Sequence, residues 1–281
     1  MMNAPQVHSG HLTKLVTHID AVLDAQVQYT LVLGEQRVPL NGLIGQQVRL
    51  EHLGQINCSN CGRKTKKSYS QGYCFPCMQK LPQCDLCIMS PERCHFDAGT
   101  CRDEAWGQAF CMQPHIVYLA NSSGLKVGIT RVNQMPTRWL DQGATQAMPI
   151  MQVATRKLSG DVETVLKQYV ADKTNWRKLL KGDAEHVDLA HAADALLNQA
   201  EEDLEALLGN LNHTDYQWLD TPAISMRYPV LEYPAKIVSH NLDKEPVLEG
   251  RLMGIKGQYL IFDTSVINIR KYSSYLVQFS S

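Results

Sequence analysis

Long hydrophobic runs are missing from this sequence. No stretch of about 18 apolar residues occurs, so we expect no membrane-spanning helix and no membrane partner. The N-terminal stretch also lacks the apolar centre of a signal peptide, and we therefore expect a cytoplasmic protein. A Gly-rich phosphate loop of the G-x-x-x-x-G-K-[ST] type is absent as well, which argues against a role driven by nucleoside triphosphates.

The chain has little net charge of either sign. Its 27 Lys and Arg residues face 28 Asp and Glu residues, for a formal charge of -1. Binding to nucleic acid would therefore need a local basic patch rather than a basic protein as a whole. One such patch consists of Arg63, Lys64, Lys66 and Lys67, which have no acidic neighbour. A solvated loop is the simpler interpretation of this run, and phosphate binding is the functional one.

The length and composition predict an α+β fold of several parts. A chain of 281 residues with 44% hydrophobic side chains can form roughly two cores. Apolar residues alternate between 27 and 50 and again between 252 and 279, which predicts short strands. We expect these terminal β segments to pair into one small sheet or barrel. The predicted parts are an N-terminal β segment (1–55), a zinc-binding cysteine-rich module (56–112), an α/β core with a long amphipathic helix over 183–208 (113–210) and a C-terminal β segment (211–281).

Four of the nine cysteines have the spacing of a zinc site. Cys58 and Cys61 form one C-x-x-C pair, and Cys74 and Cys77 form another after twelve intervening residues. Disulfides are not expected in a reducing compartment, whereas two such pairs can close one tetrahedral Zn–S4 site of the zinc-ribbon kind. Few large aliphatic residues occur between 58 and 111, as is typical where a metal replaces a hydrophobic core. We predict a structural zinc here, because sulfur ligands saturate it.

A second group of cysteines predicts a second structural zinc. Cys84 and Cys87 form a third C-x-x-C pair, and we expect Cys94 and Cys101 to complete the site. His95 is the alternative to Cys94, since two adjacent residues rarely reach the same ion. Two further residues are held in reserve as ligands: Cys111 and His115.

Residues 116–163 carry a series of short motifs. The strand I-V-Y is followed by a Ser/Gly turn, a second strand with K-V-G-I-T-R, a helix opened by Pro136 and a later helix with S-G-D-V-E. This order resembles the core of the GIY-YIG nuclease superfamily, most closely its K-[IV]-G branch. With the cysteines ahead of this core, the whole chain also resembles a bacterial family known only as a domain of unknown function.

The resemblance implies a catalytic set for phosphodiester cleavage. Tyr118 matches the tyrosine of the first motif, and Lys126 stands where the second motif often has a tyrosine. Arg138 matches the helix arginine, and Glu163 matches the glutamate that would hold Mg²⁺ or Mn²⁺. These groups would orient water and stabilise charge on the phosphorus centre. Gln142 departs from the pattern, since many members have a histidine there and glutamine accepts no proton.

The leading hypothesis is a zinc-stabilised protein that binds DNA or RNA and whose GIY-YIG-like core acts as a divalent-cation-dependent endonuclease. One alternative is a noncatalytic nucleic-acid reader with a degenerate core. The other is a scaffold whose zinc knuckles bind a protein partner. The residues expected to contact nucleic acid are Arg63, Lys64, Lys66, Lys67 and Arg131.

Overall fold

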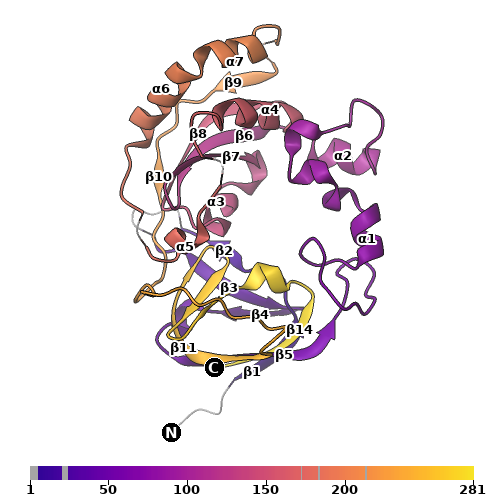
Figure 1. Ribbon diagram of the computed structural model, residues 1–281, viewed down its shortest axis with the longest axis vertical. Helices are drawn as coiled ribbons and strands as arrows, with labels where there is room; N and C mark the ends of the chain where they lie inside the picture. Colours follow the sequence, from indigo (N-terminus) through magenta and orange to yellow (C-terminus); the bar gives the residue numbers. More distant parts are fainter. Residues whose placement is uncertain (1–5, 21–24, 172, 183, 213) are drawn as a thin grey trace. The chain divides into compact units, whose positions relative to one another are not determined.

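A computed structural model describes residues 6–20, 25–171, 173–182, 184–212 and 214–281. The chain folds into two compact units of mixed α and β structure (Figure 1). In the described ranges, no helix combines the length and the apolar character needed to cross a bilayer. Unit 1 comprises Met1–Gln79, Leu180–Gly182 and Arg227–Ser281, and unit 2 comprises Lys80–Leu179 and Asp183–Met226.

Both ends of the chain contribute to a six-stranded antiparallel sheet in unit 1 (Figure 1). β14 (Tyr275–Ser280) lies between β1 (Val7–His11) and β5 (Gln47–Ile56). The expected pairing of the N-terminal and C-terminal β segments is therefore confirmed. The described strands form an open sheet, however, and not a closed barrel, because β1 and the last strand of the order do not pair. The remaining strands in spatial order are β11 (Val247–Lys256), β12 (Tyr259–Phe262) and β13 (Val266–Asn268).

A three-stranded antiparallel sheet also belongs to unit 1. Its central strand is β3 (Gln28–Leu33), whose apolar side chains are buried as the alternation in the sequence predicts. Asn41 fastens the start of this strand: its amide oxygen accepts a hydrogen bond from the N–H of Tyr29 (2.8 Å), and its amide nitrogen donates to the carbonyl of Val27 (2.9 Å). The other elements are β2 (Val16–His18), β4 (Gln36–Pro39) and the short 3-10 helix η1 (Asn41–Leu43).

Unit 2 contains a five-stranded antiparallel sheet. Its central strand β6 (His115–Asn121) lies between β7 (Leu125–Arg131) and β8 (Gln146–Val153), and every residue of β6 is buried. Strands β6 and β7 lie where the sequence predicts them, and α3 (Thr137–Asp141) follows Pro136 as expected. The remaining elements are β9 (Tyr216–Trp218), β10 (Ile224–Ser225), η5 (Val132–Gln134) and α5 (Trp176–Leu179).

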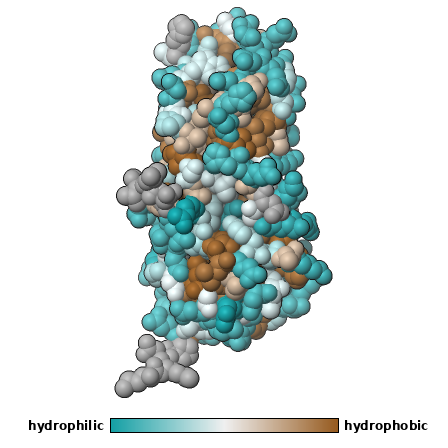
Figure 2. All heavy atoms as spheres, turned by 90° about the vertical axis from the view of Figure 1, so that its left-hand side faces the viewer, coloured by the Kyte–Doolittle hydropathy of each residue, from teal (hydrophilic) through white to brown (hydrophobic). Residues whose placement is uncertain are grey.

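Three helices pack on this sheet through apolar side chains. One hydrophobic core joins Val117 of the sheet to apolar residues of three helices. These helices are α4 (Arg156–Leu166), α6 (Leu189–Gln199) and α7 (Glu201–Leu208). The surface is more polar. On the side of the molecule drawn in Figure 2, hydrophobic residues emerge as separate patches among hydrophilic ones.

The long helix predicted over 183–208 is two helices in the structure. α6 (Leu189–Gln199) begins where the side chain of Asp188 caps its N-terminus. Ala200 then leaves the helical conformation (φ -97°, ψ 6°), and α7 (Glu201–Leu208) starts anew. Three acidic residues occupy the first turn of α7, where the positive end of the helix dipole favours them. The acidic residues favour a new helix start at this point. The periodicity of apolar residues does not report charge, so the sequence pattern predicted one helix where the structure has two.

The cysteine-rich segment 58–111 consists of short helices and loops. Apart from prolines and glycines, its buried apolar residues are cysteines, namely Cys58, Cys74 and Cys111. The border between the two units follows Gln79, so the first four cysteines belong to unit 1 and the others to unit 2. The four-part division of the chain stays a prediction. The elements here are α1 (Phe75–Lys80), η2 (Pro82–Cys84), η3 (Leu86–Ile88), η4 (Pro91–Arg93) and α2 (Glu104–Phe110).

A buried glutamine joins distant parts of unit 1 and provides a test of the fold. The side chain of Gln258 accepts a hydrogen bond from the N–H of Leu15 (2.8 Å) and donates one to its carbonyl (3.1 Å). Gln258→Leu should lower the free energy of unfolding by about 1–3 kcal/mol, because both backbone groups of Leu15 lose their partner. Urea denaturation measures this loss. The exposed Gln47→Leu is the control, and equal effects of the two changes would show that the bridge contributes nothing.

Candidate functional site

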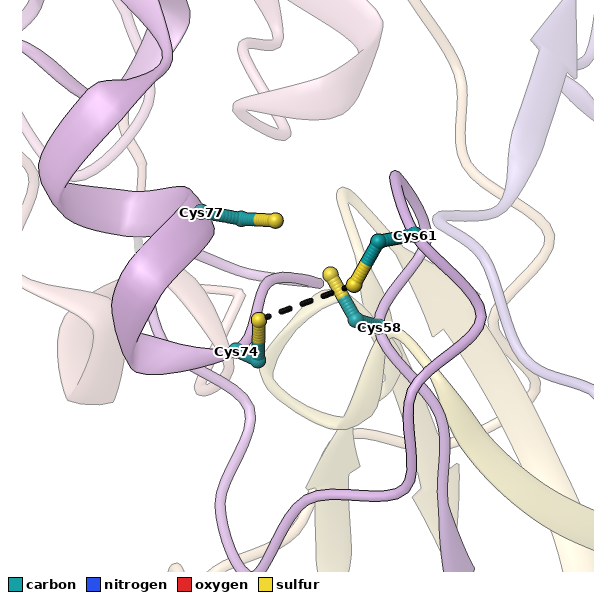
Figure 3. A group of neighbouring side chains, drawn as sticks. All are labelled: Cys58, Cys61, Cys74 and Cys77. Atoms are coloured by element: carbon teal, nitrogen blue, oxygen red, sulfur yellow. Dashed lines mark hydrogen bonds between the residues drawn. The ribbon is translucent and has the colours of Figure 1, made fainter.

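Four cysteines of unit 1 converge on one point. Cys58 and Cys61 lie in the loop after β5, whereas Cys74 precedes α1 and Cys77 lies within it. Their Sγ atoms all lie within 4.8 Å of one another, and those of Cys61 and Cys74 are 3.8 Å apart (Figure 3). A tetrahedral ion with Zn–S bonds of about 2.3 Å requires sulfur–sulfur distances of about 3.8 Å. The predicted four-cysteine cluster is thus confirmed as a set that suits one metal ion.

The local electrostatics act in opposite directions on two cysteines of this cluster. Burial raises the pKa of Cys58, but backbone N–H groups of Cys74, Cys61 and Asn60 donate to its sulfur and lower its pKa to about 6. The amide of Asn60 donates to Cys77 Sγ (3.4 Å) and lowers the pKa of that thiol, yet burial and the neighbouring thiols together raise it to about 12. A metal ion must therefore displace protons from the cluster when it binds.

Backbone hydrogen bonds attach the cluster to the rest of unit 1. The N–H of Ser59 donates to the carbonyl of Gly72 (2.8 Å), and the hydroxyl of Ser274 donates to the same carbonyl (2.6 Å). The hydroxyls of Ser59 and Ser274 are also hydrogen-bonded (2.8 Å). Ser274 directly precedes β14, so the two metal-binding loops are fastened beside a strand of the six-stranded sheet.

The basic hairpin, Arg63 to Lys67, lies between Cys61 and Cys74. Its four cationic residues are all exposed, and none forms an ion pair within the described residues. Two hydrogen bonds hold the backbone of its first half: the N–H of Cys58 donates to the carbonyl of Arg63 (2.9 Å), and that of Thr65 donates to the carbonyl of Ile56 (2.9 Å). The cluster thus holds four exposed cations on an ordered turn.

The second group of cysteines is only partly assembled as predicted. Cys87, Cys94 and Cys101 line one small cavity in unit 2, whereas Cys84 is not among the described residues that line it. Cys111, the residue held in reserve as a ligand, does line this cavity. Burial raises the pKa of Cys111 to about 11; nearby Arg156 opposes this rise, and the other three lining cysteines add to it. The thiols are therefore close enough to influence one another.

Of the two histidines considered as ligands, His95 also lines this cavity, whereas His115 lies in the sheet. His95 lies 3.6 Å from Asp85 and 2.8 Å from the hydroxyl of Thr100. His115 is fully buried in β6, where its Nδ1 is hydrogen-bonded to the carbonyl of Gln113 (2.7 Å). Burial lowers the pKa of His115 to about 4, so this ring is neutral at physiological pH.

Two of the residues predicted as catalytic, Tyr118 and Lys126, donate to the side chain of Gln142, which departs from the motif. Tyr118 donates its hydroxyl hydrogen to Oε1 of Gln142 (3.0 Å), and Lys126 Nζ donates to the same oxygen (2.8 Å). Tyr118 is 0% exposed and Lys126 is 3% exposed. Gly128 lies opposite Tyr118 in the sheet, and a Cβ atom there would be 2.7 Å from the phenol. The glycine of the K-V-G motif is therefore required by the packing of the tyrosine.

Arg138 and Glu163 lie beside this network. Burial raises the pKa of Tyr118, Arg138 opposes this rise through its charge and a hydrogen bond, and Glu163 reinforces it. Both residues are partly exposed, unlike Tyr118 and Lys126. The four positions that the resemblance selects thus come together, but the phenol stays protonated and two of them face away from solvent.

Two further basic residues have packing roles. The guanidinium of Arg131, an expected nucleic-acid contact, lies over the ring of Phe110 at 4.8 Å, and burial lowers its pKa. Arg156, which the motifs do not single out, donates from its backbone N–H to the carbonyl of Cys111 (2.8 Å) and from its side chain to that of Ile88 (2.7 Å). No spacing rule could have found Arg156, because its partners lie far away in the sequence.

Comparisons with known proteins yield one match. A family model with the description "Protein of unknown function (DUF2797)" matches residues 45–277, which include all nine cysteines and the strands and helices of unit 2. No curated protein and no solved structure matches the chain.

The four-cysteine cluster predicts a metal content that can be measured. Cys61→Ser and Cys77→Ser should each remove one zinc ion per chain and lower the midpoint of thermal unfolding, because a structural zinc contributes on the order of 10 kcal/mol to folding. Elemental analysis and calorimetry of the purified chain measure both effects. Cys84→Ser, which alters a cysteine outside the cluster, should keep this ion. Unchanged zinc content in the first two variants would contradict the assignment.

Proposed function

The chain belongs to the family of proteins of unknown function (DUF2797), and from its own residues we propose that it is a zinc-stabilised protein that binds DNA or RNA. The basic hairpin is the observation that carries this proposal. Its cations Arg63, Lys64, Lys66 and Lys67 are exposed and have no carboxylate partner within the described residues. A phosphate backbone would bind such a turn and release its own counterions.

The charge of the metal centre does not cancel the hairpin. Four thiolates around a divalent cation leave a net charge of about -2, whereas the hairpin contributes four positive charges. A positive excess therefore stays at the surface. Because hydrogen bonds at Arg63 and Thr65 fix the backbone, the cations lose less conformational entropy on binding than those of a free loop would. The cytoplasmic location expected from the sequence also suits thiolate ligands.

The core of unit 2 supports phosphate chemistry of the same kind. In our proposal, the four residues form a GIY-YIG-like constellation. They follow the motif order, Tyr118 and Lys126 share the amide oxygen of Gln142, and Arg138 and Glu163 lie near Tyr118. The side-chain oxygen of Gln142 accepts hydrogen bonds from the buried Tyr118 and Lys126, and a glutamine cannot act as a base. We therefore favour a noncatalytic reader, in which this core has kept its architecture and lost its base.

Cleavage is the second candidate function, and the partial exposure of Arg138 and Glu163 favours it. Glu163 would supply a carboxylate ligand to Mg²⁺ or Mn²⁺, and Arg138 would stabilise negative charge at the phosphorus centre. An endonuclease of this kind would still require a group other than Gln142 to activate water.

Binding can be tested with charge variants of the basic hairpin. Fluorescence anisotropy with labelled single-stranded DNA, duplex DNA and RNA should show binding that weakens with salt. The triple variant Lys64→Gln, Lys66→Gln and Lys67→Gln should reduce the slope of log affinity against log salt for duplex DNA by about 3, one unit for each lost phosphate contact.

The matched control neutralises three exposed lysines elsewhere in unit 1 and changes the net charge equally. Its substitutions are Lys236→Gln, Lys244→Gln and Lys271→Gln. If the slope falls as much in this control as in the hairpin variant, the basic hairpin is not a specific contact site for nucleic acid. Absence of binding to all three nucleic acids at low salt would reject the proposal and leave the protein-binding scaffold.

Cleavage is tested with the same labelled nucleic acids in Mg²⁺ or Mn²⁺. We expect intact substrate with the native chain, because the core lacks a general base. Cleavage that disappears in both Glu163→Gln and Tyr118→Phe would establish the endonuclease instead. Activity that survives both changes would come from elsewhere than this site.

A further inference from the structure

We propose a second metal centre in unit 2, in which Cys87, Cys94, Cys101 and Cys111 hold one zinc ion. Its fourth ligand is Cys111, and Cys84 takes no part. The centre does not depend on nucleic-acid binding, and its test is independent of that function.

The four cysteines surround a space suited to a single ion. They line one cavity of about 10 Å³, which is close to the volume that one water-sized occupant requires. Cys87 lies in η3 and Cys94 follows η4, whereas Cys101 precedes α2 and Cys111 ends it. Four elements that bury almost no aliphatic side chain thus turn a sulfur-bearing residue toward one place. The four sulfur atoms do not all lie within 4.8 Å of one another, and zinc would draw them to the separation of about 3.8 Å that a tetrahedral site requires.

The competing ligands near this cavity already have partners. Asp85, Cys87 and His95 also lie within 4.8 Å of one another. Asp85, however, accepts a hydrogen bond from the N–H of Leu86 (2.6 Å) as the cap of η3, and its second oxygen pairs with Arg102 (2.7 Å). His95 interacts with this same carboxylate. Asp85 and His95 therefore belong to a surface ion-pair network, and Cys87 is left for the sulfur centre.

A positive charge lies beside the four thiols. Four thiolates and Zn²⁺ would carry a net charge of about -2, and the low-dielectric interior requires compensation nearby. The charge of Arg156 acts on Cys111, Cys87 and Cys94. Its Nε atom is buried and has no hydrogen-bond acceptor within the described residues. A metal-bound thiolate is an acceptor of the kind that this donor lacks.

The centre would hold helix α4 in place. The N–H of Arg156, the first residue of α4, donates to the carbonyl of Cys111. One turn later Gly160 packs so closely on η4 that a Cβ atom would lie 2.4 Å from the backbone nitrogen of Glu92. The metal would therefore fix η4 and α2 against the start of the helix that carries Glu163.

Zinc content of the full chain distinguishes the two possible fourth ligands. We expect two zinc ions per native chain, one ion in Cys111→Ser and in Cys94→Ser, and two in Cys84→Ser. One ion in the native chain would overturn the proposal. It would also be overturned if Cys84→Ser lost an ion while Cys111→Ser kept both, since that result assigns the site to Cys84.

Alkylation of the native chain gives the same answer without a mutation that could impair folding. Iodoacetamide followed by peptide mass spectrometry should modify Cys84 in the zinc-loaded protein and leave Cys87, Cys94, Cys101 and Cys111 protected. A strong chelator should then expose all four to modification together. Protection of Cys84 with free reaction of Cys111, or piecemeal exposure of the four thiols, would contradict a shared ion.

Discussion

Buried cysteines take the place of large aliphatic residues over residues 58–111, and in our proposal bound zinc does the work of a hydrophobic core there. The segment buries cysteines where other parts of the chain bury leucine and valine. The four sulfur atoms of the first cluster lie within 4.8 Å of one another, as suits one metal ion, and backbone N–H groups donate to Cys58. Without an ion, the sulfur of Cys58 favours the thiolate with no cation to balance it, whereas Cys77 keeps its proton. We therefore propose that a bound metal is a structural requirement of this segment.

The core of unit 2 shows how little separates an active site from a packed interior. The side-chain oxygen of Gln142 accepts one hydrogen bond from Tyr118 and another from Lys126. It thereby provides a partner for a buried phenol and a buried ammonium group. Such a network stabilises the strands that carry it, because an unpaired lysine there would be costly. A histidine in place of Gln142 would accept one hydrogen bond and could carry a proton. In our proposal, the exchange of that residue marks the step from a catalytic core to a binding core.

Local spacing and long-range packing were not equally accessible from the sequence. The pairs Cys58–Cys61 and Cys74–Cys77 are predictable, since each turn sets the geometry of its own two thiols. The pairing of terminal strands followed from alternation, but its register did not, because β1 pairs with β14 across almost the whole chain. Cys84 and Cys87 share the same spacing as the first pairs, yet only Cys87 reaches the cavity. The position of each loop beside another depends on packing with residues far away in the sequence. A local spacing pattern contains no information about those partners.

The interleaving of the two chain ends in unit 1 also constrains the order of folding. The N–H of Gln6 donates to the carbonyl of Ser281 (3.0 Å), and β14 separates β1 from β5. On the ribosome, β1 and β5 must therefore wait for the last strand of the chain, whereas almost all of unit 2 comes from one nearly continuous stretch that is complete much earlier. Contacts so distant in sequence form slowly and leave strand edges exposed meanwhile. Unit 2 can thus be folded while the first-made part of the protein is still unfinished.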